Sequence, residues 1–406
     1  MEDGLIKSIS TGLSQKGVRD HNERLLLSLL QRNGPMPGSD LSRLAELSPP
    51  TVSSILRRLE SEGILERGDP VRGKVGKPSI PMGLASDGVF SFGLKIGRRS
   101  TDLVLIDLNG ELREERRLTY AVPAPEEIFQ FLEDSVRNIT DAMESTLAKR
   151  ICGIGIAAPF EIWNWPDQSG DLSSALAPWE GIDLRIEAQL RTGLAVSLLN
   201  DATAACQAEH TYGRGKEFRD YAYFFIGAFI GGGVVLSNSV FEGRQGNAGA
   251  LGSLRSIGPN GESMQLVDMA SIHQLEQRLR EVDLDPQQLW TDPDSWHALS
   301  RYVDPWLGQT AQELAKAALS TCSVIDFEAV LIDGAFPASV RDDLVARVRR
   351  YVSTQDTRGL IQPRIEAGSI GGKARAIGAA TRPIGAQLMM QASVGIPSKG
   401  RDQTRL

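Results

Sequence analysis

Cysteine and histidine are scarce in this chain of 406 residues, which has three cysteines and four histidines. Cys152, Cys206 and Cys322 are odd in number and far apart in the sequence. They offer neither a CxxC metal pair nor a disulfide framework. We therefore expect a cytoplasmic, reducing environment and no metal site.

Long apolar runs are missing as well. No run reaches the roughly 18 residues that a membrane span requires. The opening residues, MEDGLIKSIS, lack the basic and then apolar pattern of a signal peptide, so we expect neither secretion nor a membrane partner. A hydrophobic content of 41% still supplies enough apolar side chains for the cores of two or three domains.

Charge is distributed unevenly along the chain, whose formal net charge is −7. Residues 16–80 hold 11 Lys/Arg against 8 Asp/Glu, a balance of +3, which leaves −10 for the remainder. So small a bias fits an ordinary protein surface. It equally fits a basic DNA-binding module joined to an acidic sensor domain.

Three helices are predicted within this basic module. The first covers 17–33, with Leu25, Leu26, Leu29 and Leu30 on one face, and ends at Gly34-Pro35. A second covers 39–44, and Ala45-Glu46-Leu47 forms the turn after it. The third begins after the N-cap Ser48, with Pro49 in its first position, and ends near residue 62 before Gly63.

The third helix has two different faces. Its apolar face comprises Val52, Ile55, Leu56 and Leu59. The opposite face presents Pro50, Ser53, Ser54 and Arg57, which suits entry into the major groove of DNA. Two short strands around a glycine-rich basic loop with Arg72, Lys74 and Lys77 then predict a wing near the minor groove. The alternative is a three-helix bundle that binds protein or has no binding partner.

Two glycine hairpins follow the module. Segment 89–120 predicts strand, turn, strand, turn, strand, and segment 221–242 repeats this pattern. Such turns can hold nucleotide phosphates with their backbone N–H groups. Here the first turn carries Arg98 and Arg99, and the second carries Phe229.

The segment GPMPGSDLSRLAELSPPTVSSILRRLESEGILERG resembles the winged helix-turn-helix of ROK-family transcriptional repressors. Arg19 and Asn22 stand where those proteins also carry Arg and Asn. Glu46 replaces the usual turn glycine, which costs about 1 kcal/mol if Glu46 takes a positive φ. The candidate DNA-contacting residues are Arg19, Ser48, Thr51, Ser53, Ser54, Arg57, Arg72, Lys74 and Lys77.

Residues 89–386 resemble the sugar-kinase domain of the same family. The resemblance runs in order through ICGIGIAAPFE, ALAPWEGIDL, SLLNDATAACQAEHTYGRGK, GNAGALGSL, IDGAF and GGKARAIGAA. It implies an α/β fold, with the winged helix-turn-helix followed by two actin-like (ribonuclease H-like) lobes and a sugar site in the cleft between them. Asp201 stands at the family's catalytic-base position, after Asn200.

The residues that phosphoryl transfer needs are altered. The family's Asp-x-Gly-Gly-Thr phosphate loop is replaced by the residues from Lys95 to Arg99, and its Gly-Thr-Gly loop by Gly227-Ala228-Phe229. Family residues Glu, His and Asn of the sugar site appear as Ala250, Ser253 and Ala175. The family's structural zinc lacks its ligands, because LRSIGPNGESMQLVD contains neither cysteine nor histidine.

Four residues remain as candidate ligand contacts: Asn200, Asp201, Trp163 and Trp165. The two tryptophans could stack on a sugar ring, or equally form a core or dimer contact. Asp201 could bind ligand, or serve only as N-cap of the alanine-rich helix after it. We expect no catalytic residue, cofactor or metal.

The predicted organisation is a DNA-binding domain over 1–80, a linker over 81–88, lobes over 89–200 and 201–375, a C-terminal helix over 376–394 returning to the first lobe, and a disordered tail over 395–406. The predicted function is a repressor of carbohydrate genes that binds a palindromic operator as a homodimer or dimer of dimers and senses a sugar. The alternatives are control by a protein partner and an active sugar kinase.

Overall fold

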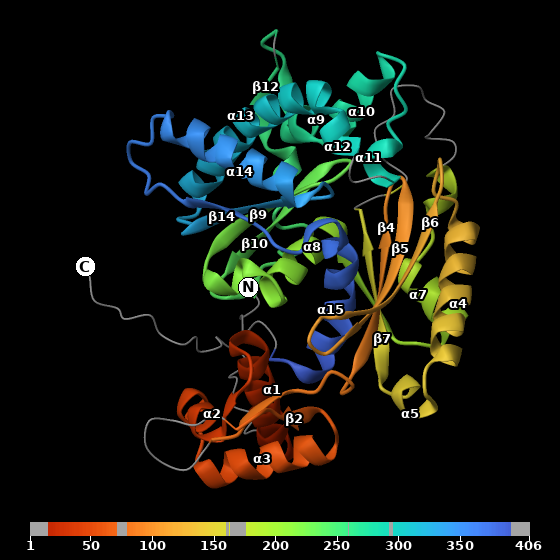
Figure 1. The fold of residues 1–406 in the computed structure, drawn as a ribbon, viewed down its shortest axis with the longest axis vertical. Coiled ribbons are helices and arrows are strands. Elements are labelled where there is room, and N and C mark those ends of the chain that lie inside the picture. Colours follow the sequence, from red (N-terminus) through yellow and green to blue (C-terminus); the bar gives the residue numbers. More distant parts are fainter. Residues whose placement is uncertain are drawn as a thin grey trace, which may run out of the picture. The chain divides into compact units, whose positions relative to one another are not determined.

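The computed structural model describes residues 15–70, 79–159, 162, 176–258, 260–291 and 295–390 (Figure 1). The chain divides into two compact units. One, called the head, consists of Met1–Ala85 together with Gly385–Leu406, and the other, called the body, is Ser86–Ile384. Among the described residues, no helix is long and apolar enough to cross a membrane.

The head contains the three predicted helices and a small antiparallel sheet of order β1-β3-β2. Ser48 caps α3 by accepting from the backbone N–H of Thr51, and Glu46 takes the left-handed conformation at φ 55°. The elements of the head are α1 (Gln15–Asn33), β1 (Met36–Pro37), α2 (Gly38–Ala45), α3 (Pro49–Ser61), β2 (Leu65–Arg67) and β3 (Pro81–Leu84).

The first helix is buried on more of its circumference than its leucine pattern predicts. Leu27 and Ser28 are buried besides Leu26, Leu29 and Leu30, whereas Leu25 is only half-buried. Ser28 faces the last described residues of the chain, since its hydroxyl accepts from the backbone N–H of Met390. The head therefore includes a C-terminal segment that the local sequence pattern of the helix did not reveal.

The body is built on two five-stranded sheets of the same topology. The first has the order β6-β5-β4-β7-β8 and the second β11-β10-β9-β14-β15. In each, an antiparallel trio is extended by two parallel strands. This repetition confirms the two matching hairpins and the two-lobed α/β fold.

The elements built on the first sheet run from β4 to β8. They are β4 (Phe90–Ile96), β5 (Ser100–Asp107), β6 (Leu112–Thr119), α4 (Pro125–Ala142), α5 (Ser145–Ala148), β7 (Ile151–Ala158), η2 (Ala177–Trp179), α7 (Leu184–Thr192) and β8 (Val196–Asn200). Apolar residues of β4 and β7 pack against α4, around Phe129 and Trp179.

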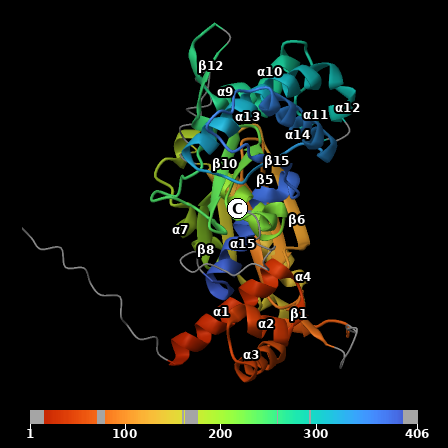
Figure 2. The same ribbon diagram turned by 90° about the vertical axis from the view of Figure 1, so that its left-hand side faces the viewer.

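The second half of the body begins with α8, and its elements up to α12 are α8 (Asp201–Thr211), η3 (Arg214–Glu217), β9 (Tyr221–Ile226), β10 (Ile230–Leu236), β11 (Ser239–Val240), η4 (Leu251–Ser253), β12 (Arg255–Ile257), β13 (Ser263–Gln265), α9 (Leu266–Ala270), α10 (Ile272–Arg280), α11 (Gln288–Thr291) and α12 (Ser295–Ala298). The remainder are α13 (Ser300–Val324), β14 (Ala329–Gly334), α14 (Ala338–Ser353), β15 (Arg364–Ala367), η5 (Gly371–Lys373) and α15 (Ala374–Leu388). Both ribbon views show the β12 hairpin extending beyond α9 (Figures 1 and 2).

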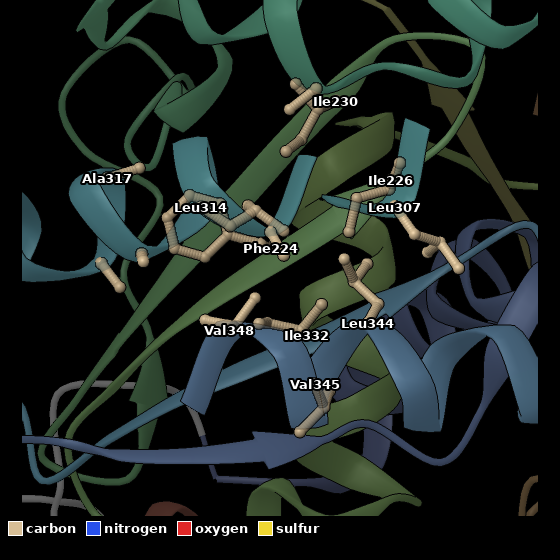
Figure 3. Packing of buried hydrophobic residues seen from close by; sticks show 14 of the residues in the cluster. Phe224, Ile226, Ile230, Leu307, Leu314, Ala317, Ile332, Leu344, Val345 and Val348 are labelled. Atoms are coloured by element: carbon tan, nitrogen blue, oxygen red, sulfur yellow. The ribbon is translucent and has the colours of Figure 1, made fainter. Parts of the chain in front are cut away.

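The largest core lies between the second sheet and helices α13 and α14 (Figure 3). Alternate residues of β9, such as Phe224 and Ile226, point into it and meet Leu314 of α13 and Leu344 of α14. The period of two along the strand and of three to four along the helices explains why both elements form here.

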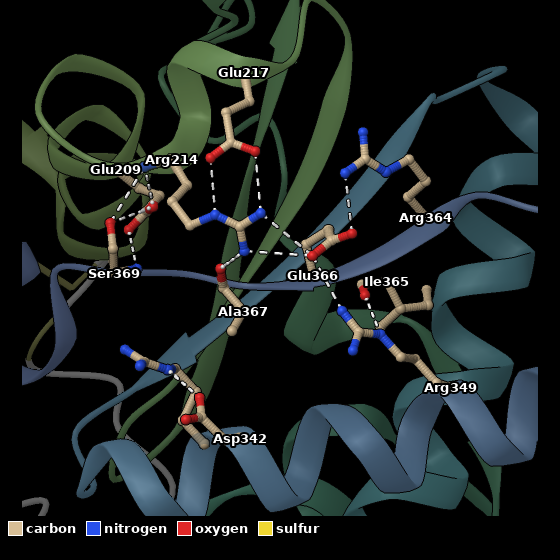
Figure 4. A network of polar contacts seen from close by, with 11 residues as sticks. Glu209, Arg214, Glu217, Asp342, Arg349, Arg364, Ile365, Glu366, Ala367 and Ser369 are labelled. Atoms are coloured by element: carbon tan, nitrogen blue, oxygen red, sulfur yellow. Dashed lines mark hydrogen bonds and ion pairs between the residues drawn. The ribbon is translucent and has the colours of Figure 1, made fainter.

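On the other side of the sheet, a buried carboxylate fixes the end of α8. Glu209 is fully buried and accepts from the backbone N–H groups of Arg214, Ser369 and Ile370. Neighbouring Arg214 pairs with Glu217 and Glu366 (Figure 4). This network holds α8, which carries the candidate ligand residues, against the loop that precedes α15.

The predicted C-terminal helix over 376–394 differs from α15 in its bounds and in its setting. The helix begins at Ala374 and ends at Leu388, and its last four residues belong to the head.

Candidate nucleic-acid interface and ligand pocket

The face of α3 that was predicted to read DNA is exposed. Ser53, Ser54 and Arg57 are solvent-accessible, whereas Val52, Ile55, Leu56 and Leu59 are buried in the head. Arg57 lies along its own helix, with Nε donating to the carbonyl of Ser53 at 3.2 Å. The helix therefore presents two hydroxyl groups and a guanidinium, the groups that contact bases and phosphates in a major groove.

The wing strands are fixed to this helix. β2 and β3 pair antiparallel through Leu65, Glu66 and Arg67. The guanidinium of Arg67 donates to both carboxylate oxygens of Glu60 on α3, at 2.6 and 3.1 Å. The wing loop with Arg72, Lys74 and Lys77, and the side chain of Arg19, lie outside the described part of the chain.

A ligand-sized pocket of about 180 Å³ lies in the body, where β8 meets α8. Its volume is below the range of about 300–1,000 Å³ that is typical of pockets for drug-sized ligands. Asn200 and Asp201 line it, and so do Ala250 and Ser253, the two residues that replace the family's Glu and His. Its complete lining is Asn200, Asp201, Ala202, Ile230, Gly231, Gly232, Asn247, Ala248, Gly249, Ala250, Gly252, Ser253 and Val267.

Asn200, and not Asp201, is the N-cap of α8. Its side-chain oxygen accepts from the backbone N–H groups of Ala202 and Thr203 at 3.0 and 3.3 Å. The alternative that Asp201 serves only as the cap is therefore wrong. Asp201 is the first residue of the helix, and its carboxylate pairs instead with Arg375 of α15 at 3.3 Å.

Side chains of the first glycine hairpin fill the space beside its turn at Gly97. The ammonium of Lys95 is buried beside Gly97 and donates to the carbonyl of Ser100 and to Asp102, which also pairs with Arg117. Burial lowers the pKa of Lys95 to about 8, and the neighbouring Asp102 charge opposes this shift. The backbone N–H of Gly97 donates to Ser100 at 3.0 Å, so this candidate phosphate donor is already used.

The second turn is closed in a similar way. The backbone N–H of Gly227 donates to the carbonyl of Phe229 at 3.3 Å. The Arg98 guanidinium lies 5.2 Å from the centre of the Phe229 ring, a cation–π contact between the two turns. The Phe229 ring also lies 5.5 Å from the His273 ring. Arg98 and Phe229 thus meet in the space between the two loops that hold phosphates in the family's kinases.

Arg99 contributes an ion pair across the body. Its Nη2 lies 3.3 Å from Oε2 of Glu276, which is buried on α10 and also accepts from Trp290 Nε1 at 2.7 Å. Burial by itself would raise the pKa of Glu276. Hydrogen bonding from His273 and the charge of Arg99 outweigh burial and hold this pKa at about 2.

Sequence reasoning missed several residues of these sites. Arg375, Glu276 and Asn247 were not singled out, because each comes from a segment distant from Asp201 or Arg99 in the sequence. For Asn247 a signal existed, since it lies within the predicted sugar block GNAGALGSL, between Gly246 and Ala248. Trp163, Trp165 and Ala175 lie outside the described residues. Within the described ranges, no cluster of three His, Cys, Asp or Glu side chains is arranged to hold a metal ion.

Two family matches cover most of the chain. Residues 91–382 match the ROK family, and residues 19–66 match a winged helix-turn-helix DNA-binding family. The xylose repressor of Bacillus subtilis (strain 168) is 26% identical over 244 residues, which are 59% of this chain and 62% of the repressor. The DNA-binding transcriptional dual regulator NagC of Escherichia coli (strain K12) is 24% identical over 252 residues, 60% of this chain and 59% of NagC. The matches thus span about three-fifths of these relatives.

Solved structures share the fold. A ROK family transcriptional regulator described as a homolog of the E. coli MLC protein gives a TM-score of 0.63 at 19% identity, covering 91% of this chain and 98% of that one. A ROK family glucokinase from Streptomyces griseus, in complex with glucose and AMPPNP, gives 0.56 at 21% identity and covers 72% of this chain and 98% of its own. The regulator's larger coverage of this chain agrees with the presence of a head before the kinase-like body.

Proposed function

Because this chain belongs to the ROK family and carries a winged helix-turn-helix match, we propose that it is a DNA-binding transcriptional repressor controlled by a sugar. The head binds duplex DNA through Ser53, Ser54 and Arg57 of α3, with Arg19, Ser48, Thr51 and the wing residues Arg72, Lys74 and Lys77 as further contacts. A homodimer on a palindromic operator would place two heads on half-sites about one helical turn, or a multiple of it, apart.

One observation supports this function over sugar phosphorylation. The pocket beside Asn200 and Asp201 is retained, whereas the Arg98–Phe229 contact occupies the space between the two phosphate turns. Phosphoryl transfer depends on positioned phosphates and magnesium, and the phosphate donors Gly97 and Gly227 bond within their own turns. The body is therefore a sensor that binds a sugar without phosphorylating it.

The effector class follows from the pocket and from the relatives. Asn200, Asp201, Asn247 and Ser253 offer hydrogen-bonding groups in a space for one small polar molecule. The relatives are named for xylose and N-acetylglucosamine, which makes these two sugars the first probes. We propose a monosaccharide or a simple derivative, bound through Asn200 and Asp201, with Trp163 and Trp165 as additional candidates.

The test selects duplexes from a random library with the full chain and then measures their affinity with and without a panel of sugars. The proposal expects one palindromic sequence class and at least one sugar that changes its affinity about fivefold or more. Failure to enrich any sequence would contradict DNA-binding regulation. Enrichment without a response to any sugar would favour control by a protein partner.

A further inference from the structure

The first turn of helix α15 forms an ion pair with Asp201, a residue that lines the ligand pocket. Arg375 Nη1 lies 3.3 Å from Asp201 Oδ2, and the guanidinium carbon lies 5.1 Å from the centre of the Phe225 ring. The Arg375 side chain is only 12% exposed, so it has little freedom to adopt another position. A ligand that hydrogen-bonds to Asp201 would compete with or reorient this ion pair.

The middle of α15 is close-packed against both halves of the body. A methyl group on Gly93 of β4 would overlap the carbonyl oxygen of Ala376, and one on Gly155 of β7 would overlap that of Ala379. On the α8 side, a methyl group on Gly378 would overlap the carbonyl oxygen of Ala204. Figure 1 shows α15 between α8 and the strands β4 and β7 accordingly. Since close-packed interiors transmit displacement, α15 must respond when α8 moves relative to the first sheet.

Pro383 and Gly385 of α15 lie at the boundary of the two units, which falls between Ile384 and Gly385. Pro383 has no backbone N–H to donate to Ala379, and such a position bends a helix. Among the described residues, no atom other than those of the chain neighbours and the helix's own nearby backbone lies within 4 Å of where a Cβ on Gly385 would be. These two residues together allow the helix to bend there while the chain remains continuous.

The described residues after this boundary, 385–390, belong to the head and contact α1. Arg24 of α1 donates through Nη1 to the carbonyl oxygens of Ala386 and Met389, at 3.2 and 3.3 Å. Carbonyl groups at a helix C-terminus lack partners within the helix, so Arg24 satisfies them. The backbone N–H of Met390 donates to Ser28 Oγ at 2.9 Å. Ser28 itself is buried in α1.

We propose that α15 transmits the state of the ligand pocket to the DNA-binding head. Arg375 is the positioning residue at the pocket, and Arg24 and Ser28 receive the displacement on α1. This inference rests on the proposed function and adds the element through which it operates. It requires that a change at Arg375, a residue of the body, alter DNA binding by the head.

The experiment needs no identified sugar. Duplexes selected by the wild-type chain are titrated with Arg375→Gln, with Ser28→Ala and with the double variant. Arg347→Gln on α14 is the matched control, because Arg347 is also a half-buried arginine paired with carboxylates, Asp304 and Asp343. We expect Arg375→Gln to change the dissociation constant of the duplex at least fivefold and Arg347→Gln to leave it within twofold.

A non-additive double variant separates transmission from general destabilisation. If the Asp201–Arg375 ion pair and the Ser28–Met390 hydrogen bond both act through α15, adding Arg375→Gln to Ser28→Ala changes the dissociation constant of the duplex little further. Amide hydrogen exchange in Arg375→Gln should then change at residues 24–30, while β9 keeps its protection. Asp201→Asn, which removes the other partner of the same ion pair, serves the same titration if Arg375→Gln does not fold. An Arg375 variant that binds the selected duplex as the wild type does would overturn the inference alone. A wild-type chain that selects no duplex would overturn the proposed function.

Discussion

Arg99 Nη2 lies 3.3 Å from Glu276 Oε2, so an arginine of the first glycine turn is paired with a buried carboxylate of α10. The Arg98–Phe229 contact joins the hairpins of the two sheets through protein side chains, and the Arg99–Glu276 pair joins the first hairpin to α10. In a kinase of this fold a bound nucleotide would lie between those hairpins. Here the chain's own side chains make that contact, which supports the proposal of a sensor without phosphoryl transfer.

Glu276→Gln should lower the free energy of unfolding at pH 7 by about 3–5 kcal/mol, because Arg99 and Arg280 both lose their buried carboxylate partner. The folded pKa of about 2 lies below the ordinary 4.5, so Glu276 binds fewer protons in the folded state than in the unfolded one. Its contribution is complete above pH 4.5 and is lost as the pH falls from 4.5 through 2. Urea unfolding at pH 7 and pH 3 should show the difference between wild type and variant shrinking at pH 3.

Glu187→Gln, which breaks a half-buried surface pair with Arg191, is the control and should change stability by less than about 1 kcal/mol. An unchanged difference at the two pH values would contradict this assignment.

The wild-type chain should not bind MgATP. Arg98 and Phe229 contact each other between the two glycine turns, and the backbone N–H groups of Gly97 and Gly227 are engaged. At about 1 mM MgATP, the upper end of common enzyme KM values, we expect no shift of the melting temperature and no sugar-dependent release of ADP. Turnover at roughly 1–100 s⁻¹ with any sugar would show that the protein is a kinase.

The packing of α15 predicts opposite effects for two glycines in one helix. Gly378→Ala should destabilise the body by about 1–3 kcal/mol or more, because the methyl group would overlap the carbonyl of Ala204. Gly385→Ala, with no neighbour within 4 Å, should stabilise by up to about 1 kcal/mol through helix propensity. Thermal unfolding of both variants measures the contrast. Equal effects would mean that α15 is not packed tightly against α8.

The sequence predicted the helices of the head and the two hairpins well, because their signals are local. Ser48 with Pro49 sets the start of α3, and the alternation of apolar residues sets β4 and β9. The resemblance of the glycine blocks to those of a known family located Asn200 and Asp201 at the pocket that the structure contains.

The contacts that matter for coupling could not be predicted in this way. Asp201 and Arg375 are 174 residues apart, and Arg24 and Met389 are 365 apart. Neither pair has a spacing or composition that marks it, because they meet only once α15 has packed. The N-cap of α8 was ambiguous between two adjacent polar residues. The backbone geometry decides it, since Asn200 is extended and Asp201 is already helical.

Arg57→Ala should weaken binding to the selected duplex by about 1–3 kcal/mol if Arg57 reads a base. Within the described part of the chain, Arg57 bonds only to the carbonyl of Ser53 on its own helix, so its removal should not unfold the head. Titrating the variant against duplexes with single base-pair changes shows whether specificity relaxes at one position. A uniform loss across all duplexes would make Arg57 a phosphate contact. Arg43→Ala, an exposed arginine on α2, is the control for general charge loss.

The most direct measurement of the central claim is a fluorescence anisotropy titration of the selected duplex with and without the sugar that stabilises the protein in a thermal-shift screen. The wild-type chain should show a change of at least about fivefold in the dissociation constant of the duplex. Ala250→Phe, whose ring fills the pocket of about 180 Å³, should bind the duplex with no response to that sugar. A wild-type affinity that is the same with and without the sugar, or a variant that still responds at the same sugar concentration, would contradict the account.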